Sequence, residues 1–166
     1  MSAAGPARPP HPRVLARTLA MQLLYAWEAN RYVDDAELLP GPERSEAGDS
    51  ALALARKLFA QVAAQRVPLD GHIDRRLTNW TIHRLAATDR AILRLAAWEL
   101  LYDEGVPPKV AITEAIRLAR DFGSDDKTPR LVNGVLDRIA REHRGLGQDK
   151  DAGKGPEPAR GDAKPG

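Results

Sequence analysis

Leucine and alanine recur every three or four residues along most of this 166-residue chain, whereas alternating β-branched or aromatic residues are nearly absent. This spacing places apolar side chains along one face of an α-helix, which turns once in about 3.6 residues. A half-buried strand would instead need an apolar residue at every second position. The pattern therefore predicts an all-α fold without strands.

Proline and glycine divide the pattern into six or seven helices with short connections. The segment 31–48, which contains Pro40 and Gly41, is expected to be a loop. The longer helices are expected at 13–30, 49–66, 88–104, Pro108–Gly123 and Thr128–Ile139, and Pro68 is expected to stop the second of them. A short helix is expected at Leu69–Leu77 and a helical turn at 83–86.

Individual residues indicate where these helices begin and end. The hydroxyls of Thr88 and Thr128 can accept an unpaired first-turn N–H, so we expect both threonines to be N-caps. Gly105 suits the left-handed position that ends a helix. Pro108 can open a helix because its missing N–H costs nothing there, and Gly123 is expected to close that helix.

The two ends of the chain differ from the middle in composition. Residues 1–12 are rich in proline and carry Arg8 without any acid. Residues 145–166 are rich in glycine, proline, lysine and aspartate, and their opposite charges balance. Such segments cannot bury enough apolar surface to offset the entropy of ordering. We therefore expect a disordered basic arm, one folded domain over 13–144, and a disordered tail.

Catalytic and metal-binding signatures are missing from the sequence. Without cysteine there is no disulfide, thiolate zinc site, iron–sulfur cluster or cysteine nucleophile, and the composition fits a reducing cytoplasm. The four histidines form no HExxH pair, and no glycine-rich phosphate loop occurs. No apolar run approaches the ~20 residues of a membrane span. We expect no metal, no cofactor and no enzymatic activity.

Basic residues give a stronger signal. Arg8, Arg13 and Arg17 lie in the first 17 residues, which contain no acid, and Arg13 and Arg17 project from one helical face. Gln22 and Tyr25 follow on the same helix. Arginine can fork onto phosphates and tyrosine can stack on an unpaired base. Periodicity alone leaves two interpretations open, an RNA-binding face or an ordinary solvated helix start.

A second basic set consists of Lys109, Arg117, Arg120 and Arg130. Taken alone, this set fits an ordinary amphipathic helix. The acids concentrate elsewhere, at 103–104, 121 and 125–126. A basic arm and a separate acidic face could hold RNA on one side and a basic protein on the other.

The tryptophans and one glycine carry structural expectations. Trp27, Trp80 and Trp98 are expected to fill the core or the interface between subdomains. Gly134 is expected to let two helices approach closely, because it has no Cβ, and the neighbouring Asn133 could bond to the backbone.

Several motifs follow one another along the chain. They are ARTLAMQLLYAWE at 16–28, TDRAILRLAAWELL at 88–101, VPPKVAITEAI at 106–116, FGSDD at 122–126 and VNGVLD at 132–137. In order and at near-family spacing, these motifs resemble the NusB family of bacterial transcription antitermination factors. The first resembles the family's first helix and the second its central helix. The likeness covers about 13–142 and is weak between 31 and 80.

The resemblance implies two packed helical subdomains and no catalysis. It also implies binding of boxA-type RNA together with NusE, a protein of the small ribosomal subunit, within the antitermination complex on RNA polymerase. The residues that it places on the RNA side are Arg13, Arg17, Gln22, Tyr25, Lys109, Arg130 and Asn133, with Arg8 in the arm. Those placed toward NusE are Asp89, Asp125 and Asp126.

Two other hypotheses remain open at this point. The same fold could serve as the RNA-binding module of a separate enzyme that modifies ribosomal RNA. Alternatively, 90–104 and 109–121 could form a DNA-binding helix-turn-helix, although Val110, Ala111 and Ile112 near the start of the second helix favour burial over base contacts. The sequence leaves open whether the protein is a monomer or a homodimer.

Overall fold

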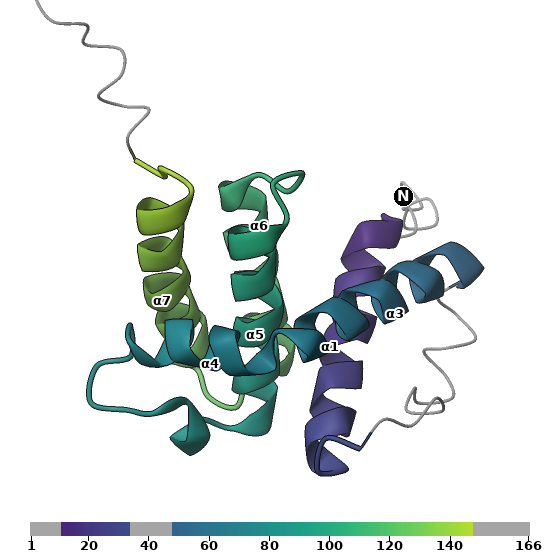
Figure 1. The fold of residues 1–166 in the computed structure, drawn as a ribbon, viewed down its shortest axis with the longest axis horizontal. Coiled ribbons are helices and arrows are strands. Elements are labelled where there is room, and N and C mark those ends of the chain that lie inside the picture. The colour runs from purple at the N-terminus through teal and green to yellow at the C-terminus, as the bar shows by residue number, and fades with distance from the viewer. Residues whose placement is uncertain (1–10, 34–47, 148–166) are drawn as a thin grey trace, which may run out of the picture.

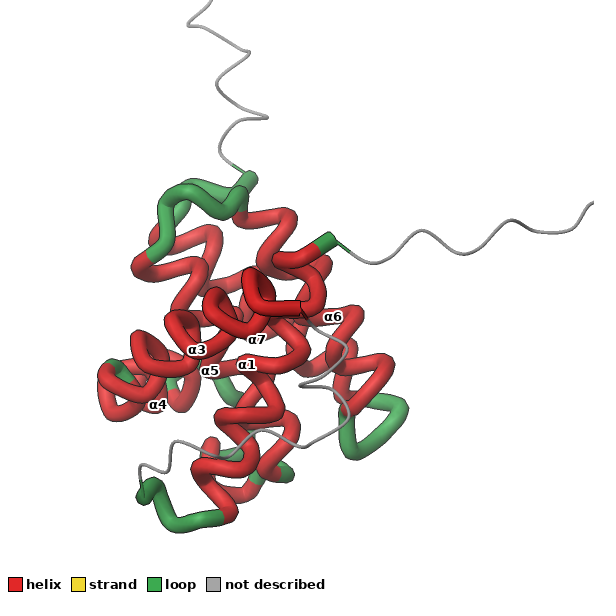
Figure 2. Tube along the Cα trace, turned by 90° about the vertical axis from the view of Figure 1, so that its right-hand side faces the viewer, coloured by secondary structure: helices red, strands yellow, loops and turns green. Residues whose placement is uncertain are grey.

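The computed structural model describes residues 11–33 and 48–147, and every regular element in these ranges is helical (Figures 1 and 2). The all-α prediction is confirmed for these ranges. Most of the expected arm, tail and 31–48 loop lies outside them. The elements are α1 (Pro12–Ala29), α3 (Gly48–Ala64), α4 (Arg66–Asp74), the short 3-10 helix η1 (Ile82–Arg84), α5 (Ala87–Tyr102), α6 (Pro108–Phe122) and α7 (Thr128–His143).

Helix α5 is the centre of the fold. Every residue from Ala91 to Leu100 is buried, as expected for a helix surrounded by others. It packs against α1, α3, α4, α6 and α7. Helices α1 and α3 pair on one side of α5, and α6 and α7 pair on the other (Figure 1). This arrangement confirms two packed helical subdomains, with α5 shared between them.

Buried charges join α5 to its neighbours. The Arg94 guanidinium of α5 bonds to both carboxylate oxygens of Asp70 in α4, at 2.7 and 2.9 Å, and to Glu28 in α1 at 3.0 Å. Arg90 also pairs with Glu28. Burial by itself would lower the pKa of Arg94, but hydrogen bonding and charge from Asp70 and Tyr32 hold that pKa above its usual value. The buried guanidinium therefore stays charged and ties three helices together.

Some expected helix ends are wrong. Helix α5 begins at Ala87, so Thr88 lies inside its first turn. Thr128 begins α7, after the N-cap residue Lys127, and its hydroxyl bonds to Asp89 rather than to a helix N–H. Gly105 is not left-handed; its N–H bonds to the Asp103 carboxylate, which forms the turn after α5 by another route.

The boundary signals of α6 hold. Pro108 begins α6 and Gly123 is its C-cap, as expected. The expected stop at Pro68 is wrong, because α3 already ends at Ala64 and Pro68 lies in the first turn of α4, which begins at Arg66. A proline is tolerated there because first-turn N–H groups have no partner within the helix.

Two packing expectations are wrong. Trp27 and Trp98 are buried, but Trp80 is 56% exposed on the loop before η1. Gly134 is exposed on α7, and an added Cβ would meet nothing within 4 Å. It therefore does not mediate a close helix contact between described residues. Sequence periodicity could not place Trp80, because this loop lies between helices.

Replacing Arg94 with alanine is expected to lower the free energy of unfolding by about 3–5 kcal/mol, because two carboxylates would lose their buried partner. Urea denaturation followed by circular dichroism measures this change. The exposed Arg56 of α3 gives a matched control, and Arg56→Ala should stay within about 0.5 kcal/mol of the parent protein. Equal stabilities for the two variants would contradict a structural role for the buried network.

Candidate nucleic-acid interface

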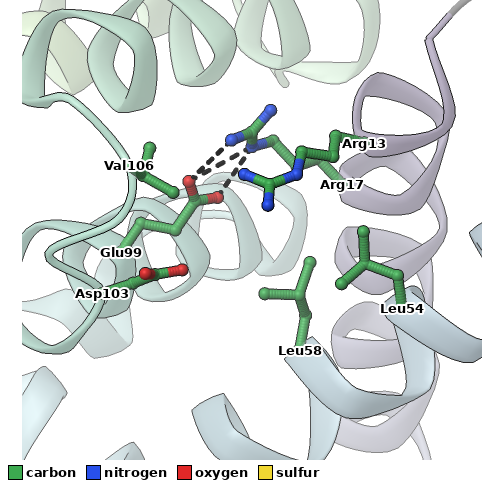
Figure 3. A pocket seen from close by; sticks show the side chains of 7 residues that line it. All are labelled: Arg13, Arg17, Leu54, Leu58, Glu99, Asp103 and Val106. Atoms are coloured by element: carbon green, nitrogen blue, oxygen red, sulfur yellow. Dashed lines mark hydrogen bonds and ion pairs between the residues drawn. The ribbon is translucent and has the colours of Figure 1, made fainter.

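Arg17 of α1 points into the protein. Its guanidinium forms two parallel contacts with the Glu99 carboxylate of α5, at 2.9 and 3.0 Å (Figure 3). The side chains of Arg17 and Glu99 are only 8% and 3% exposed. This contact corrects the expectation that Arg17 faces RNA, because its donors are used internally. Sequence spacing could not reveal the pairing, since the partner lies 82 residues away.

Burial and ion pairing have opposite effects on the pKa values of Arg17 and Glu99. Burial raises the pKa of Glu99, because desolvation penalises a carboxylate, and the hydrogen bond and charge of Arg17 act in the opposite direction. Burial acts to lower the pKa of Arg17, but Glu99 outweighs it and holds that pKa above its usual value. Arg13, one turn earlier, is exposed and lines a small cavity of about 60 Å³ beside the pair. Of the two arginines, Arg13 is the one that remains accessible.

The outward face of α1 carries the other expected residues. Thr18, Gln22, Tyr25 and Ala29 follow one another at spacings of four, three and four, which places them along one side of the helix. Tyr25 is 45% exposed. Gln22 and Tyr25 line a hollow of about 510 Å³, whose remaining lining residues are Ala26, Ala29 and Asn30.

The Gln22 amide contains a buried acceptor. Among the described residues, its Oε1 finds no hydrogen-bond partner, which is unfavourable for a buried polar atom. The accessible feature of this hollow is therefore the exposed ring of Tyr25, on whose flat face an unpaired base can stack.

Arg117 links this side of α1 to α6. Its Nη2 donates to the Val14 carbonyl at 3.3 Å and to the Thr18 hydroxyl at 3.5 Å. It also pairs with Glu114 and Asp121 of its own helix. Thr18 lies one turn from Gln22, so the α1 hollow begins one turn from this link. In the sequence Arg117 belongs to a basic set, and its bridge to α1 could not be predicted because the partners lie 103 and 99 residues away.

Residues of α6 line two neighbouring hollows. A hollow of about 280 Å³ is lined by Thr113, Ile116, Arg117, Arg120 and Asp121. A larger groove of about 510 Å³ lies between α6 and α7 and shares Thr113 and Ile116 with that hollow. Lys109 of α6 and Asn133 of α7 both line this groove, so the fold brings these two expected residues together. Arg130 is exposed on α7, one turn before Asn133.

We call the surface that carries these hollows the α1–α6–α7 face. It is defined by Gln22, Tyr25, Arg117, Arg120, Lys109 and Asn133. The expected residue Arg8 lies outside the described residues.

Asp89 has a structural role instead of a surface one. It is only 4% exposed. Its carboxylate accepts bonds from the Ser124 N–H at 3.0 Å, the Ser124 hydroxyl at 2.6 Å and the Thr128 hydroxyl at 3.2 Å. These bonds fix the link between α6 and α7. The expectation that Asp89 faces a protein partner is therefore corrected, because the carboxylate is used internally.

Asp125 and Asp126 lie within the link that Asp89 holds. Both are exposed, and the Asp125 carboxylate accepts the Lys127 N–H at 2.7 Å. They remain candidates for contact with a protein partner. The link lies at the end of α6 opposite Lys109 (Figure 1). Arg130, in the first turn of α7, lies close to this acidic link, so the basic and acidic surfaces adjoin there.

Two classes of site have no support among the described residues. No helix there is long and apolar enough to cross a membrane. No group of three or more His, Asp or Glu side chains in the same ranges could hold a metal ion.

A helical fold with a concave basic face is typical of a nucleic-acid-binding protein. The model of the NusB family matches residues 15–141. A "Transcription antitermination protein NusB" of Treponema pallidum subsp. pallidum is 41% identical over 76% of this chain and 90% of its own length. A protein of the same name from Bacillus velezensis is 39% identical over 76% of this chain and 94% of its own. The chain belongs to the NusB family.

Solved structures agree with this assignment. The NusB of T. maritima superposes with a TM-score of 0.68 and 32% identity, over 80% of this chain and 93% of that one. A structure of antitermination factors NusB and NusE in complex with dsRNA superposes with a TM-score of 0.66 and 26% identity, over 79% of this chain and 97% of that one.

Replacing Asp89 with alanine is expected to lower the free energy of unfolding by about 2–3 kcal/mol, because Ser124 and Thr128 would lose a charged hydrogen-bond acceptor. Asp126→Ala, which removes a neighbouring exposed carboxylate, should change the unfolding free energy by no more than about 0.5 kcal/mol. Chemical denaturation of both variants measures the difference. A stable Asp89→Ala protein would show that the link does not depend on this carboxylate.

Proposed function

We propose that this protein is a transcription antitermination factor that binds boxA-type RNA of nascent ribosomal RNA together with NusE. In this role it joins the antitermination complex on RNA polymerase in the bacterial cytoplasm, and it acts by binding, without catalysis. The curated relatives carry the name transcription antitermination protein, and one structural neighbour was solved with NusE and dsRNA. The observation that carries the proposal is the α1–α6–α7 face, on which Tyr25 lines the hollow of α1 and Lys109 and Asn133 line the groove between α6 and α7.

The chemistry of this face suits single-stranded RNA. Tyr25 offers an exposed ring on which a splayed base can stack, and Gln22 lines the same hollow. Lys109 and Arg120, both exposed and near opposite ends of α6, can each neutralise a phosphate. Asn133 carries both donors and an acceptor for a base edge. Arg13 extends the positive charge to the beginning of α1.

The exposed acids suit the protein partner. Asp125 and Asp126 lie on a link that Asp89 holds in one conformation. Carboxylates fixed on a surface attract a basic ribosomal protein and orient it. NusE bound here would lie next to Arg130, at the edge of the RNA face. Each partner would then contribute part of the RNA-binding surface, so RNA should bind more tightly to the complex.

Tyr25→Ala is expected to weaken boxA RNA binding about tenfold, because stacking on an aromatic side chain contributes about 1–3 kcal/mol per base. The measurement is fluorescence anisotropy of labelled boxA RNA, titrated with the protein alone and with NusE. Tyr102 gives a matched control: it is 46% exposed, at the end of α5, and outside the lining of these hollows. Tyr102→Ala should bind like the parent protein.

The controls for this titration are a scrambled RNA and duplex DNA. Equal loss of binding for Tyr25→Ala and Tyr102→Ala would contradict the placement of the RNA face. Enhancement by NusE that is absent for scrambled RNA supports the antitermination role. Absence of both selectivity and enhancement, with active NusE, would favour the hypothesis of a module that assists an RNA-modifying enzyme. Preference for duplex DNA would favour a helix-turn-helix.

Lys109→Ala is expected to weaken binding of every RNA sequence to a similar extent. The slope of log K against log salt concentration should become shallower by about 0.7, the value for one phosphate contact on a single strand. Lys57→Ala, which removes an exposed lysine of α3, should leave the slope unchanged. Identical slopes for the two variants would remove Lys109 from the proposed contacts.

A further inference from the structure

The groove between α6 and α7 is large enough to hold a ligand of its own, beyond a strand that contacts only Lys109 and Asn133. Its volume of about 510 Å³ falls within the usual range for small-molecule pockets. Three segments form it: α6, α7 and the residues that follow α7. The lining side chains beyond Lys109 and Asn133 are Ile112, Thr113, Ile116, Asp137, Arg141 and Leu146.

The segment after α7 builds one wall of the groove. Gly145 is left-handed, with φ of 65°, and the Leu146 N–H bonds to the Ala140 carbonyl at 3.2 Å. This is the geometry by which a glycine ends a helix and turns the next side chain back onto it. Leu146 consequently packs against the core. The wall is thus part of the folded structure, although we expected residues 145–166 to form a tail.

Arg141 is held at the mouth of this groove. Its Nε bonds to the Asp137 carboxylate at 2.7 Å. Gly147 is left-handed, a conformation that favours glycine, and it lies against the Arg141 guanidinium. The Arg141 side chain is nevertheless 59% exposed. It therefore keeps donors available for a ligand while Asp137 holds its position.

The lining has a mixed character that fits a nucleotide. Ile112, Ile116 and Leu146 supply apolar surface. Lys109 and Arg141 supply two positive charges, against the single carboxylate of Asp137. Helices α6 and α7 run in opposite directions, so Lys109, at the start of α6, and Arg141, near the end of α7, lie at the same end (Figure 1). The groove thus has a cationic end for a phosphate and an apolar wall for a base.

We propose that this groove binds one further unpaired nucleotide of the RNA, an inference that rests on the proposed function. The base contacts Ile112, Ile116 and Leu146. Its edge bonds to Asn133 and Thr113, and its phosphate lies between Lys109 and Arg141. Because the groove shares Thr113 and Ile116 with the Arg120 hollow, a strand that stacks on Tyr25 can continue across α6 into it. Arg141 and Thr113 are thereby added to the RNA contacts.

The first test reverses one charge in the groove of the full chain. Arg141→Glu is expected to weaken boxA RNA binding in the presence of NusE about tenfold, since two units of charge change beside a phosphate. Arg56→Glu makes the same change of charge on the exposed surface of α3. It should have an effect of less than about twofold. Equal weakening by both variants would overturn the proposal, because it would report net charge alone.

A second test adds a carboxylate without touching an arginine. Thr113 is exposed on α6, so Thr113→Glu should fold normally and weaken RNA binding. Thr81→Glu, at an exposed position before η1, should also fold normally but leave RNA binding unchanged. A third test is photo-crosslinking of boxA RNA that carries 4-thiouridine at one nucleotide at a time. One nucleotide should crosslink to peptides of α6 or α7, and a different nucleotide should crosslink to α1.

The outcomes separate this inference from the proposed function. The groove site alone would be overturned by one combination of results. Tyr25→Ala would lose RNA binding, crosslinks would be confined to α1, and Arg141→Glu and Thr113→Glu would bind RNA like the parent protein. Failure of the parent protein to bind RNA, with or without NusE, would overturn both. A change of oligomeric state in Arg141→Glu, measured by light scattering, would show that a second copy of the chain occupies the groove, and would also overturn it.

Discussion

The guanidinium of Arg94 lies at the centre of the bundle, where it requires carboxylates from two other helices. Glu28 and Asp70 supply them, so α1 and α4 can pack on α5 only in a register that brings these charges together. Arg17 and Glu99 repeat this constraint closer to the beginning of α1. Helix α1 is therefore attached to α5 at two points, eleven residues apart and on one side of the helix. Gln22 and Tyr25 lie between these points, and the attachments fix the direction in which both face.

Charged residues in this chain have different roles that sequence spacing does not distinguish. Arg13 and Arg17 are one turn apart and look equivalent in the sequence, yet Arg13 is exposed and Arg17 is paired with Glu99. Similarly, Asp89 is buried whereas Asp126 is exposed. The difference depends on partners far away in sequence, at Glu99 for Arg17 and at Ser124 and Thr128 for Asp89. Local pattern carries no information about such pairs.

The helices could be predicted because their determinants are local. The 3.6-residue period marked α1, α5, α6 and α7, and Pro108 and Gly123 marked the ends of α6. The Tyr25 and Lys109 positions followed from resemblance, and the fold places each of them in the lining of a hollow. The α6–α7 groove could not be predicted in this way. Its wall depends on Leu146, which lies in a segment of tail-like composition and is folded back only because Gly145 is left-handed.

Both proposed surfaces are positioned by α5. Its Arg90, Arg94 and Glu99 hold α1, which carries Tyr25, and its Asp89 holds the link that carries Asp125 and Asp126. RNA and protein partner would thus meet surfaces whose separation is set by one buried helix. Such a scaffold lowers the entropy lost on binding, because the contact residues are ordered beforehand. On the proposed function, cooperation between the two partners would need no conformational change in this protein, because RNA and NusE bound at adjoining edges near Arg130 would contact each other.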